Sequence, residues 1–230
     1  MRRLLRRLRF ENWPGECPIC EQRTRFFAFG PWYRDQLLCE RCRSIPRERA
    51  LMRVIQLLYP DWRSLKVHES SPAERGVSAK LKRECPGYVP TQYPELDLER
   101  QHFGNEVFDL VITQDVFEHL LEPDLAIREI VRTLKPGGAH IMTVPIVRKG
   151  QHSERRAARD RTHLKEPEYH ANPVGEGSLV TVDWGYDIAD YLTEKSGSPT
   201  NIFMIDDRRR GICAEYNDVV VTRKNAPPAI

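Results

Sequence analysis

The order of apolar and polar residues divides the chain into short helical and extended segments. Residues 46–58 place apolar side chains at helical spacing, with Ser44 before them as a cap and Pro46 in the first turn. A second helix is predicted over 123–134, followed by the stop signal Lys135-Pro-Gly-Gly138. Between these helices, residues 108–113 form a mainly apolar run typical of a buried parallel strand.

The remaining periodic segments predict an α/β fold. Strands are expected over 64–68, 87–93, 139–144, 201–206 and 217–222, a loop entering a helix over 71–83, and a further helix over 186–195. Strand, helix and strand at this spacing form a βαβ unit and therefore a parallel sheet. Residues 145–185 show little periodicity, and a connection of this length is usually a lid or a substrate loop.

Composition narrows the class of protein. The chain has 230 residues, of which 40% are apolar and 30% are charged, as in globular domains. Its apolar runs are too short to span a membrane, and no secretory h-region follows the basic start, so we expect a cytoplasmic protein. We divide it into a basic segment 1–15, a metal-binding unit with its linking helix over 16–60, a main domain 61–225 and a tail 226–230. No pattern sets an oligomeric state.

The charge is unevenly spread along a chain whose net charge is only +3. Residues 1–53 hold 13 basic and 6 acidic side chains, so this part could touch a polyanion, although the balance of the whole chain does not indicate a dedicated nucleic-acid binder. The alternative is that the arginines at the start form a solvated or amphipathic end.

Four cysteines form two C-x2-C pairs, Cys17 with Cys20 and Cys39 with Cys42. Each pair lets two thiolates converge from one side, and two facing pairs complete a tetrahedron around Zn²⁺. The aromatic residues 26–33 between the pairs predict a short hairpin beside the metal. Because all four positions are cysteines and none is open, we expect a structural zinc rather than a catalytic one.

The segment 108–119, together with 128–138, resembles class I S-adenosylmethionine-dependent methyltransferases. In that family the fourth strand ends in a loop with a Glu-His pair, and a Leu-Lys-Pro-Gly-Gly turn leads into the fifth strand. The resemblance covers roughly residues 64–224. It implies a Rossmann-like methyltransferase sheet, mostly parallel with an antiparallel C-terminal strand, to which the zinc ribbon is an N-terminal appendage.

The resemblance also implies where S-adenosylmethionine binds. The cofactor would lie at the carboxyl ends of the strands, on residues matched position by position: Glu69, Ser70, Ser71, Gln92, Asp97, Leu98, Gln114 and Asp115. The chain departs from the family at the first strand, where Ser70, Ser71 and Pro72 replace the glycine turn, and at the second, where Gln92 replaces an acidic residue. The alternative for these residues is ordinary loop polarity.

Histidines are the candidates for removing a proton from the methyl acceptor. His119 follows the fourth strand, whereas His163 and His170 lie in the insertion. The alternatives are a loop anchor for His119 and internal loop hydrogen bonding for the other two. We also considered a divalent metal held by His163, Glu168 and His170, stacking of Trp184 and Tyr186 on the acceptor, and steering of an acidic acceptor by the insertion's arginines.

We therefore expect methyl transfer to oxygen or nitrogen of a small-molecule acceptor, such as a sugar or a secondary metabolite. The first alternative is a non-catalytic scaffold with the methyltransferase fold, which the glycine-poor turn after Glu69 favours. The second is a nucleic-acid methyltransferase that docks through the zinc ribbon. The sequence Thr113-Gln-Asp-Val116 is not of the Asn-Pro-Pro-Tyr type and argues against methylation of base amino groups.

Overall fold

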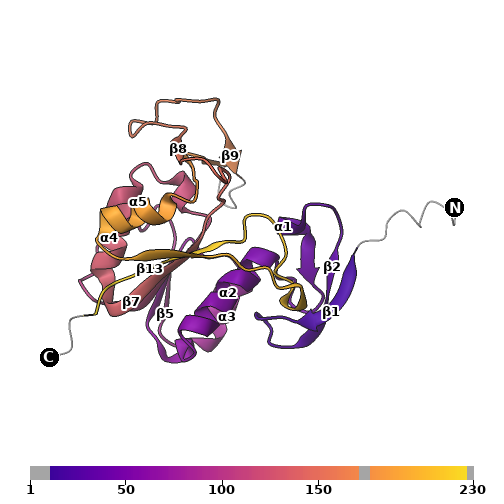
Figure 1. Cartoon of the computed structure of the whole chain (residues 1–230). Helices are drawn as coiled ribbons and strands as arrows, with labels where there is room; N and C mark the ends of the chain where they lie inside the picture. Colours follow the sequence, from indigo (N-terminus) through magenta and orange to yellow (C-terminus); the bar gives the residue numbers. More distant parts are fainter. Residues whose placement is uncertain (1–10, 171–176, 227–230) are drawn as a thin grey trace.

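The structure is a computed structural model that describes residues 11–170 and 177–226. Its centre is a six-stranded sheet in the order β12-β13-β7-β6-β4-β5 (Figure 1). The strands are β4 (Val67–Ser70), β5 (Tyr88–Thr91), β6 (Phe108–Gln114), β7 (Leu134–Thr143), β12 (Thr200–Phe203) and β13 (Val219–Arg223). Strands β5, β4, β6 and β7 are parallel, and β13 is antiparallel to both β7 and β12. The predicted fold class is confirmed.

Helices cover both faces of this sheet (Figure 1). Helices α2 (Pro46–Leu58) and α3 (Gly76–Glu84) pack on one face, and α4 (Pro123–Thr133) and α5 (Ile188–Ser196) pack on the other. Side chains alternate between the two cores along β6: Leu110 and Ile112 join the α2 side, and Val111 joins the α4 side. Both faces of the strand are therefore buried, which explains its mainly apolar sequence. None of the described helices is long and apolar enough to cross a membrane.

The N-terminal unit is a small antiparallel sheet of three strands. It contains β1 (Asn12–Glu16), β2 (Arg23–Ala28) and β3 (Leu37–Cys39), with the one-turn helix α1 (Tyr33–Gln36) before β3. Its apolar side chains, including Phe26, belong to the same core as α2 and the central sheet. The ribbon therefore shares its core with the main domain. Residues 1–10 of the predicted basic segment and 227–230 of the tail lie outside the described residues.

Two local predictions need correction. Ser44 does not cap α2: Ile45 occupies that position and donates its backbone N–H to Glu48, while the Ser44 hydroxyl lies 3.2 Å from the Cys42 sulfur. Strand β7 begins at Leu134, immediately after α4, rather than at Ala139. The predicted turn Pro136-Gly-Gly138 lies within β7, at the point where the pairing of β7 with β6 is irregular.

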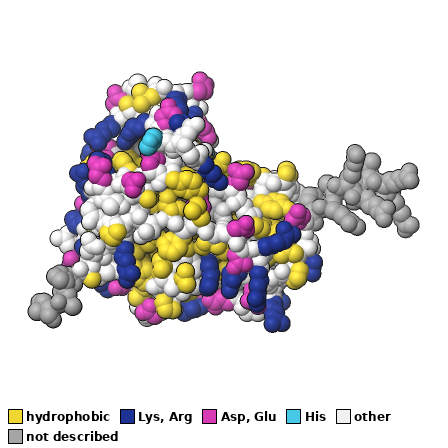
Figure 2. Space-filling view, viewed as in Figure 1, with side chains coloured by type: hydrophobic (Ala, Val, Ile, Leu, Met, Phe, Trp, Pro, Cys, Tyr) yellow, Lys and Arg dark blue, Asp and Glu magenta, His cyan; other side chains and the backbone are white. Residues whose placement is uncertain are grey.

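The insertion folds over the carboxyl ends of the strands as a loop with short two-residue strands. These are β8 (Glu154–Arg155), β9 (Tyr169–His170), β10 (Ser178–Leu179) and β11 (Val182–Asp183), paired as β8 with β11 and β9 with β10. In Figure 2 the insertion rises above the sheet as a separate lobe. Three further one-turn 3-10 helices, η2 (Trp62–Ser64), η3 (Phe117–His119) and η4 (Arg208–Arg210), connect the larger elements.

Candidate functional site

A buried carboxylate lies at the carboxyl end of β4. Glu69 is fully buried, and its oxygens accept hydrogen bonds from Tyr88 (2.6 Å), Ser78 (2.8 Å) and the side-chain amide of Gln114 (2.6 Å). Burial raises the pKa of Glu69, against the effect of these donors. The structure therefore brings Glu69 and Gln114, both predicted to contact the cofactor, together in one cluster that links β4, β5, β6 and α3.

The remaining residues predicted for the cofactor line the same edge. Ser70 is buried at the end of β4, and Ser71 follows it with a left-handed backbone (φ 56°). Asp97 accepts a hydrogen bond from the backbone N–H of Glu99 at 2.9 Å, which fixes the turn containing the buried Leu98.

Two of these residues keep free hydrogen-bonding groups at this edge. The side chains of Ser71 and Gln92 are partly exposed and have no hydrogen-bond partner among residues 11–170 and 177–226. Polar groups thus surround the position where an open α/β sheet binds its ligand.

Asp115 connects this edge to the N-terminal ribbon. Its carboxylate accepts hydrogen bonds from Arg34 of α1 at 2.7 Å and from the hydroxyl of Thr143 at 3.0 Å, and it forms an ion pair with Arg47 of α2 at 3.0 Å. Burial opposes ionisation of Asp115, but the two guanidinium groups outweigh it and hold the pKa of this carboxyl below its usual value. The predicted cofactor residue Asp115 is thus engaged by the ribbon.

The four cysteines of the two C-x2-C pairs converge in the ribbon. The sulfurs of Cys17 and Cys42 are 3.6 Å apart, and those of Cys20 and Cys39 are 3.9 Å apart. Tetrahedral zinc with Zn–S bonds of about 2.3 Å would separate its sulfurs by about 3.8 Å. The donor set and its spacing therefore fit one tetrahedral metal ion.

A second group of metal-ligating side chains lies just beyond β6. Glu118 and His119 come from η3, and His170 comes from β9 of the insertion. The Glu118 oxygen Oε1 is 3.6 Å from His119 Nε2 and 3.6 Å from His170 Nδ1. The nearby Glu118 carboxylate raises the pKa of His170. This cluster can take up a proton or hold a cation at the edge where the cofactor residues lie.

Sequence reasoning identified His119 and His170 but missed Glu118. The sequence did hold a signal for Glu118, because it forms a Glu-His pair with His119 directly after a buried strand. Only the histidine of that pair was considered as a site residue. The structure does not bring His163 into the cluster: it is exposed and pairs through its backbone with Ala157. Trp184 is buried in the core against Tyr191, so it offers no stacking surface to an acceptor.

Three arginines of the insertion are paired with acidic residues. Arg148 contacts Glu154 at 2.6 Å, and Arg156 contacts Asp183 at 2.9 Å. Arg159 lies 3.2 Å from Glu122. Basic and acidic side chains are interspersed over the visible face of the molecule (Figure 2), as expected of a solvated charged surface.

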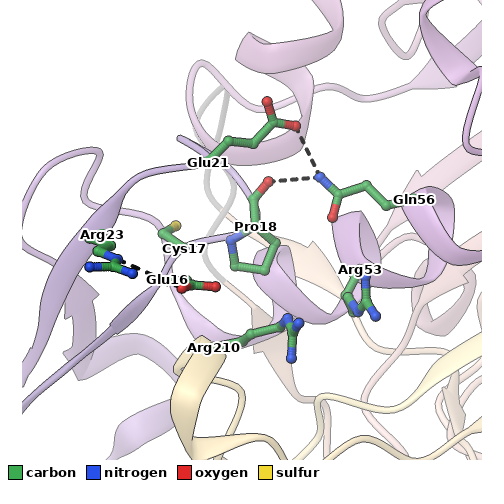
Figure 3. Close-up of a pocket in the computed structure, with 8 residues that line it drawn as sticks. All are labelled: Glu16, Cys17, Pro18, Glu21, Arg23, Arg53, Gln56 and Arg210. Carbon is green, nitrogen blue, oxygen red and sulfur yellow. Dashed lines mark hydrogen bonds and ion pairs between the residues drawn. The ribbon is translucent and has the colours of Figure 1, made fainter.

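A separate hollow of about 350 Å³ lies between the ribbon and α2 (Figure 3). The side chain of Gln56 lies at one edge of this hollow. Its amide donates to the Pro18 carbonyl at 3.1 Å and to Glu21 at 3.2 Å. Cys17 and the charged side chains of Glu16, Arg23, Arg53 and Arg210 complete the lining. Neither the Glu118 cluster nor the carboxyl ends of β4, β5 and β6 line this hollow. We call these carboxyl ends, together with the Glu118 cluster, the reactive edge, because their side-chain chemistry makes them the candidate site.

Comparison with known families gives a match over part of the chain. Residues 62–142 match the family model described as "Methyltransferase domain". The matched segment runs from η2 to the end of β7 and contains Glu69, Asp115, Glu118 and His119. It supports methyl transfer as the general chemistry of this part of the chain. Comparison with curated proteins gave no match.

Solved structures of methyltransferases are similar to this chain. A candidate sarcosine dimethylglycine methyltransferase from Galdieria sulphuraria is 13% identical, with a TM-score of 0.50 over 77% of this chain and 85% of that one. An S-adenosylmethionine-dependent methyltransferase from Mesorhizobium loti is 15% identical over 76% and 98%, with a TM-score of 0.48. A complex of the Haloferax volcanii Trm112 methyltransferase activator with its candidate enzyme matches at 11% over 80% and 92%, with a TM-score of 0.48. At 13% identity, the likeness to the Galdieria sulphuraria structure, with its TM-score of 0.50, shows a shared fold and no more.

Proposed function

We propose that this protein transfers a methyl group from S-adenosylmethionine to oxygen or nitrogen of a small-molecule acceptor. The observation that carries this proposal is the cluster of Glu118, His119 and His170 at the carboxyl end of β6. Two of its three members lie in the segment that matches a methyltransferase domain. A sugar or a secondary metabolite has the hydroxyl or amine groups that such a cluster can deprotonate.

The cofactor side of the site is built from the edge of β4, β5 and β6. S-adenosylmethionine supplies an electrophilic methyl group on a sulfonium. Ser71 and Gln92 would bind its polar groups, and Asp97 with Leu98 would contact the adenine. Gln114 is held by Glu69 at 2.6 Å and so presents a fixed amide at the boundary between cofactor and acceptor.

The acceptor side has to orient a hydroxyl or amine and receive its proton. His119 and His170 have their rings 5.1 Å apart, edge to face, on the two sides of Glu118. We therefore assign proton removal to this pair rather than to His163, which is exposed and outside the cluster.

We further propose that Cys17, Cys20, Cys39 and Cys42 hold a structural Zn²⁺. The sulfur spacing supports a tetrahedral ion, and the cytoplasm would keep these thiols reduced. The ion would fix the ribbon, and the ribbon in turn carries Arg34 to Asp115.

Calorimetric titration of the zinc-loaded protein with S-adenosylmethionine and S-adenosylhomocysteine is the first test. We expect both to bind, and transfer of a labelled methyl group to a hydroxyl or amine acceptor to fall about 10²- to 10⁴-fold in H119A and H170A, with cofactor affinity unchanged. H163A is the matched control and should retain activity. Normal methyl transfer by H119A and H170A would contradict the assignment of the acceptor site.

A scaffold without catalysis is the second candidate function. It is favoured by the glycine-poor turn after Glu69 and by the engagement of the Glu69 and Asp115 carboxylates with protein partners. Binding of neither cofactor form in the titration would favour this candidate. A nucleic-acid methyltransferase instead predicts RNA or DNA binding that falls steeply with salt.

A further inference from the structure

We infer that Glu118, His119 and His170 form a binding site for a divalent cation, separate from the four cysteines. Their ligand atoms all lie within 4.8 Å of one another. Two imidazole nitrogens each lie 3.6 Å from the same carboxylate oxygen, Glu118 Oε1. Tetrahedral coordination with bonds of about 2.0–2.2 Å separates ligand atoms by about 3.4 Å, so a small shift of the side chains would complete the site.

The Glu118 carboxylate is the group that most needs a cation. Its residue is only 2% exposed, and within the described part of the chain neither oxygen has a hydrogen-bond partner. A buried carboxylate is costly unless it is paired or coordinates a metal. The neighbouring carboxylate Asp115 already has two arginines, whereas among residues 11–170 and 177–226 Glu118 has only the two histidines at salt-bridge distance.

The second nitrogen of each histidine has a partner on its far side. His119 Nδ1 is 2.9 Å from the Leu179 carbonyl, which can only accept, so this nitrogen donates its hydrogen. In the neutral ring, Nε2 then carries no hydrogen and directs its lone pair toward Glu118. This nitrogen and the carboxylate oxygen are both acceptors, so neither can donate a hydrogen bond to the other. His170 Nε2 lies 3.6 Å from the Glu168 carboxylate. Histidines that bind metals are oriented in this way by carbonyl and carboxylate groups.

The donor set indicates the class of ion. Two imidazoles and one carboxylate suit borderline ions such as Zn²⁺ or Co²⁺ better than Ca²⁺ or Mg²⁺, which prefer oxygen ligands. Three protein ligands leave at least one position open, unlike the four-cysteine site. If the proposed methyl transfer holds, the ion would take over from the histidines the task of promoting deprotonation: an acceptor hydroxyl bound at that position would lose its proton to solvent more easily. Metal binding itself does not depend on the proposed function.

The test titrates Co²⁺ into protein whose ribbon already holds Zn²⁺. Binding is monitored by calorimetry and by visible absorption. We expect one further equivalent with weak absorption and no thiolate charge-transfer band, which distinguishes it from exchange into the cysteine site. E118Q and H170A should each lower the affinity about 100-fold, and E168Q about tenfold. H163A is the matched control and should bind as the wild type does.

Two results would overturn the site: no Co²⁺ beyond that entering the cysteines, or binding that E118Q and H170A leave unchanged. Either would assign the two histidines to metal-free proton transfer. Thermal unfolding of each variant separates loss of a ligand from loss of the fold. Co²⁺ binding without methyl transfer would refute the proposed function and keep the metal site. Full activity of protein that holds Zn²⁺ in the ribbon but no ion at Glu118 would show that this ion has no role in catalysis.

Discussion

Replacing Asp115 by Asn tests whether the ribbon is held at the reactive edge by charge. Asp115 lies 2.7 Å from Arg34 and 3.0 Å from Arg47, and these three side chains are 18%, 12% and 21% exposed. The substitution keeps the shape of the side chain and the hydrogen bond to Thr143, but it leaves two guanidinium groups facing a neutral amide. Arg47 keeps a second partner in Asp35, at 2.5 Å.

The expected cost follows from the burial of this network. Removing one partner of a fully buried ion pair costs about 3–5 kcal/mol, and exposed pairs are worth about 1 kcal/mol or less. Because the three side chains keep partial exposure and Arg47 retains Asp35, we expect D115N to lower the free energy of unfolding by about 2–3 kcal/mol. D35N is the matched control: its side chain is 45% exposed, so its cost should stay below about 1 kcal/mol.

Urea unfolding of wild type, D115N, R34M and the double variant measures the free energy that the interaction between Asp115 and Arg34 contributes to stability. The folded-state pKa of Asp115 lies below its ordinary value of 3.8, so its stabilisation is complete above that pH and is lost as the pH falls through the folded pKa. The difference between wild type and D115N should therefore be constant from pH 7 to 5 and narrow below pH 4. A coupling energy between R34M and D115N below about 0.5 kcal/mol would refute the reasoning.

Further predictions address the metal, the core and the cofactor. C39S should lose zinc from the ribbon, and unchanged zinc content would contradict the four-cysteine site. G211A should cost about 3 kcal/mol because its Cβ would lie 2.6 Å from an aromatic ring, against about 1 kcal/mol for G197A, which has open space; urea unfolding compares them. Burial lowers the pKa of His140 to about 3, so unfolding takes up a proton below pH 6.5; wild-type stability should fall from there toward pH 3, and less steeply in H140Q. D97A should weaken S-adenosylhomocysteine binding roughly fivefold in calorimetry while the sheet stays folded, with the melting temperature lowered only by the loss of the hydrogen bond to the Glu99 N–H.

Local patterns in the sequence were enough to predict the sheet and its helices. The helix predicted over 123–134 is Pro123–Thr133, and the strand predicted over 108–113 is Phe108–Gln114. Both are long, strongly patterned segments whose burial follows from their own residues. Errors occur where tertiary contacts decide: Leu134 continues directly into a strand because β7 pairs with β6, against the local Pro-Gly-Gly signal.

The arrangement of the reactive edge could not be read from local pattern. Asp115 pairs with Arg34, which is 81 positions away in the sequence, and with Arg47, and no periodicity in the sequence indicates such partners. The same is true of Glu118 and His170, which meet because the insertion folds back over η3 through the 2.7 Å bond from the Thr181 N–H to the Glu118 carbonyl. Only the convergence of the four cysteines was predictable, since their spacing itself encodes the tetrahedron.

These contacts give the ribbon a part in the electrostatics of the reactive edge. Arg34 neutralises Asp115, and its positive charge also opposes protonation of His170. The edge therefore holds two carboxylates in different states: Asp115 is paired by cations from the ribbon and α2, while Glu118 is left with the two histidines. A ribbon that only stabilised the fold would have no need to carry an arginine to the end of β6. Its placement there would couple the integrity of the cysteine site to the charge that the proposed acceptor or cation meets.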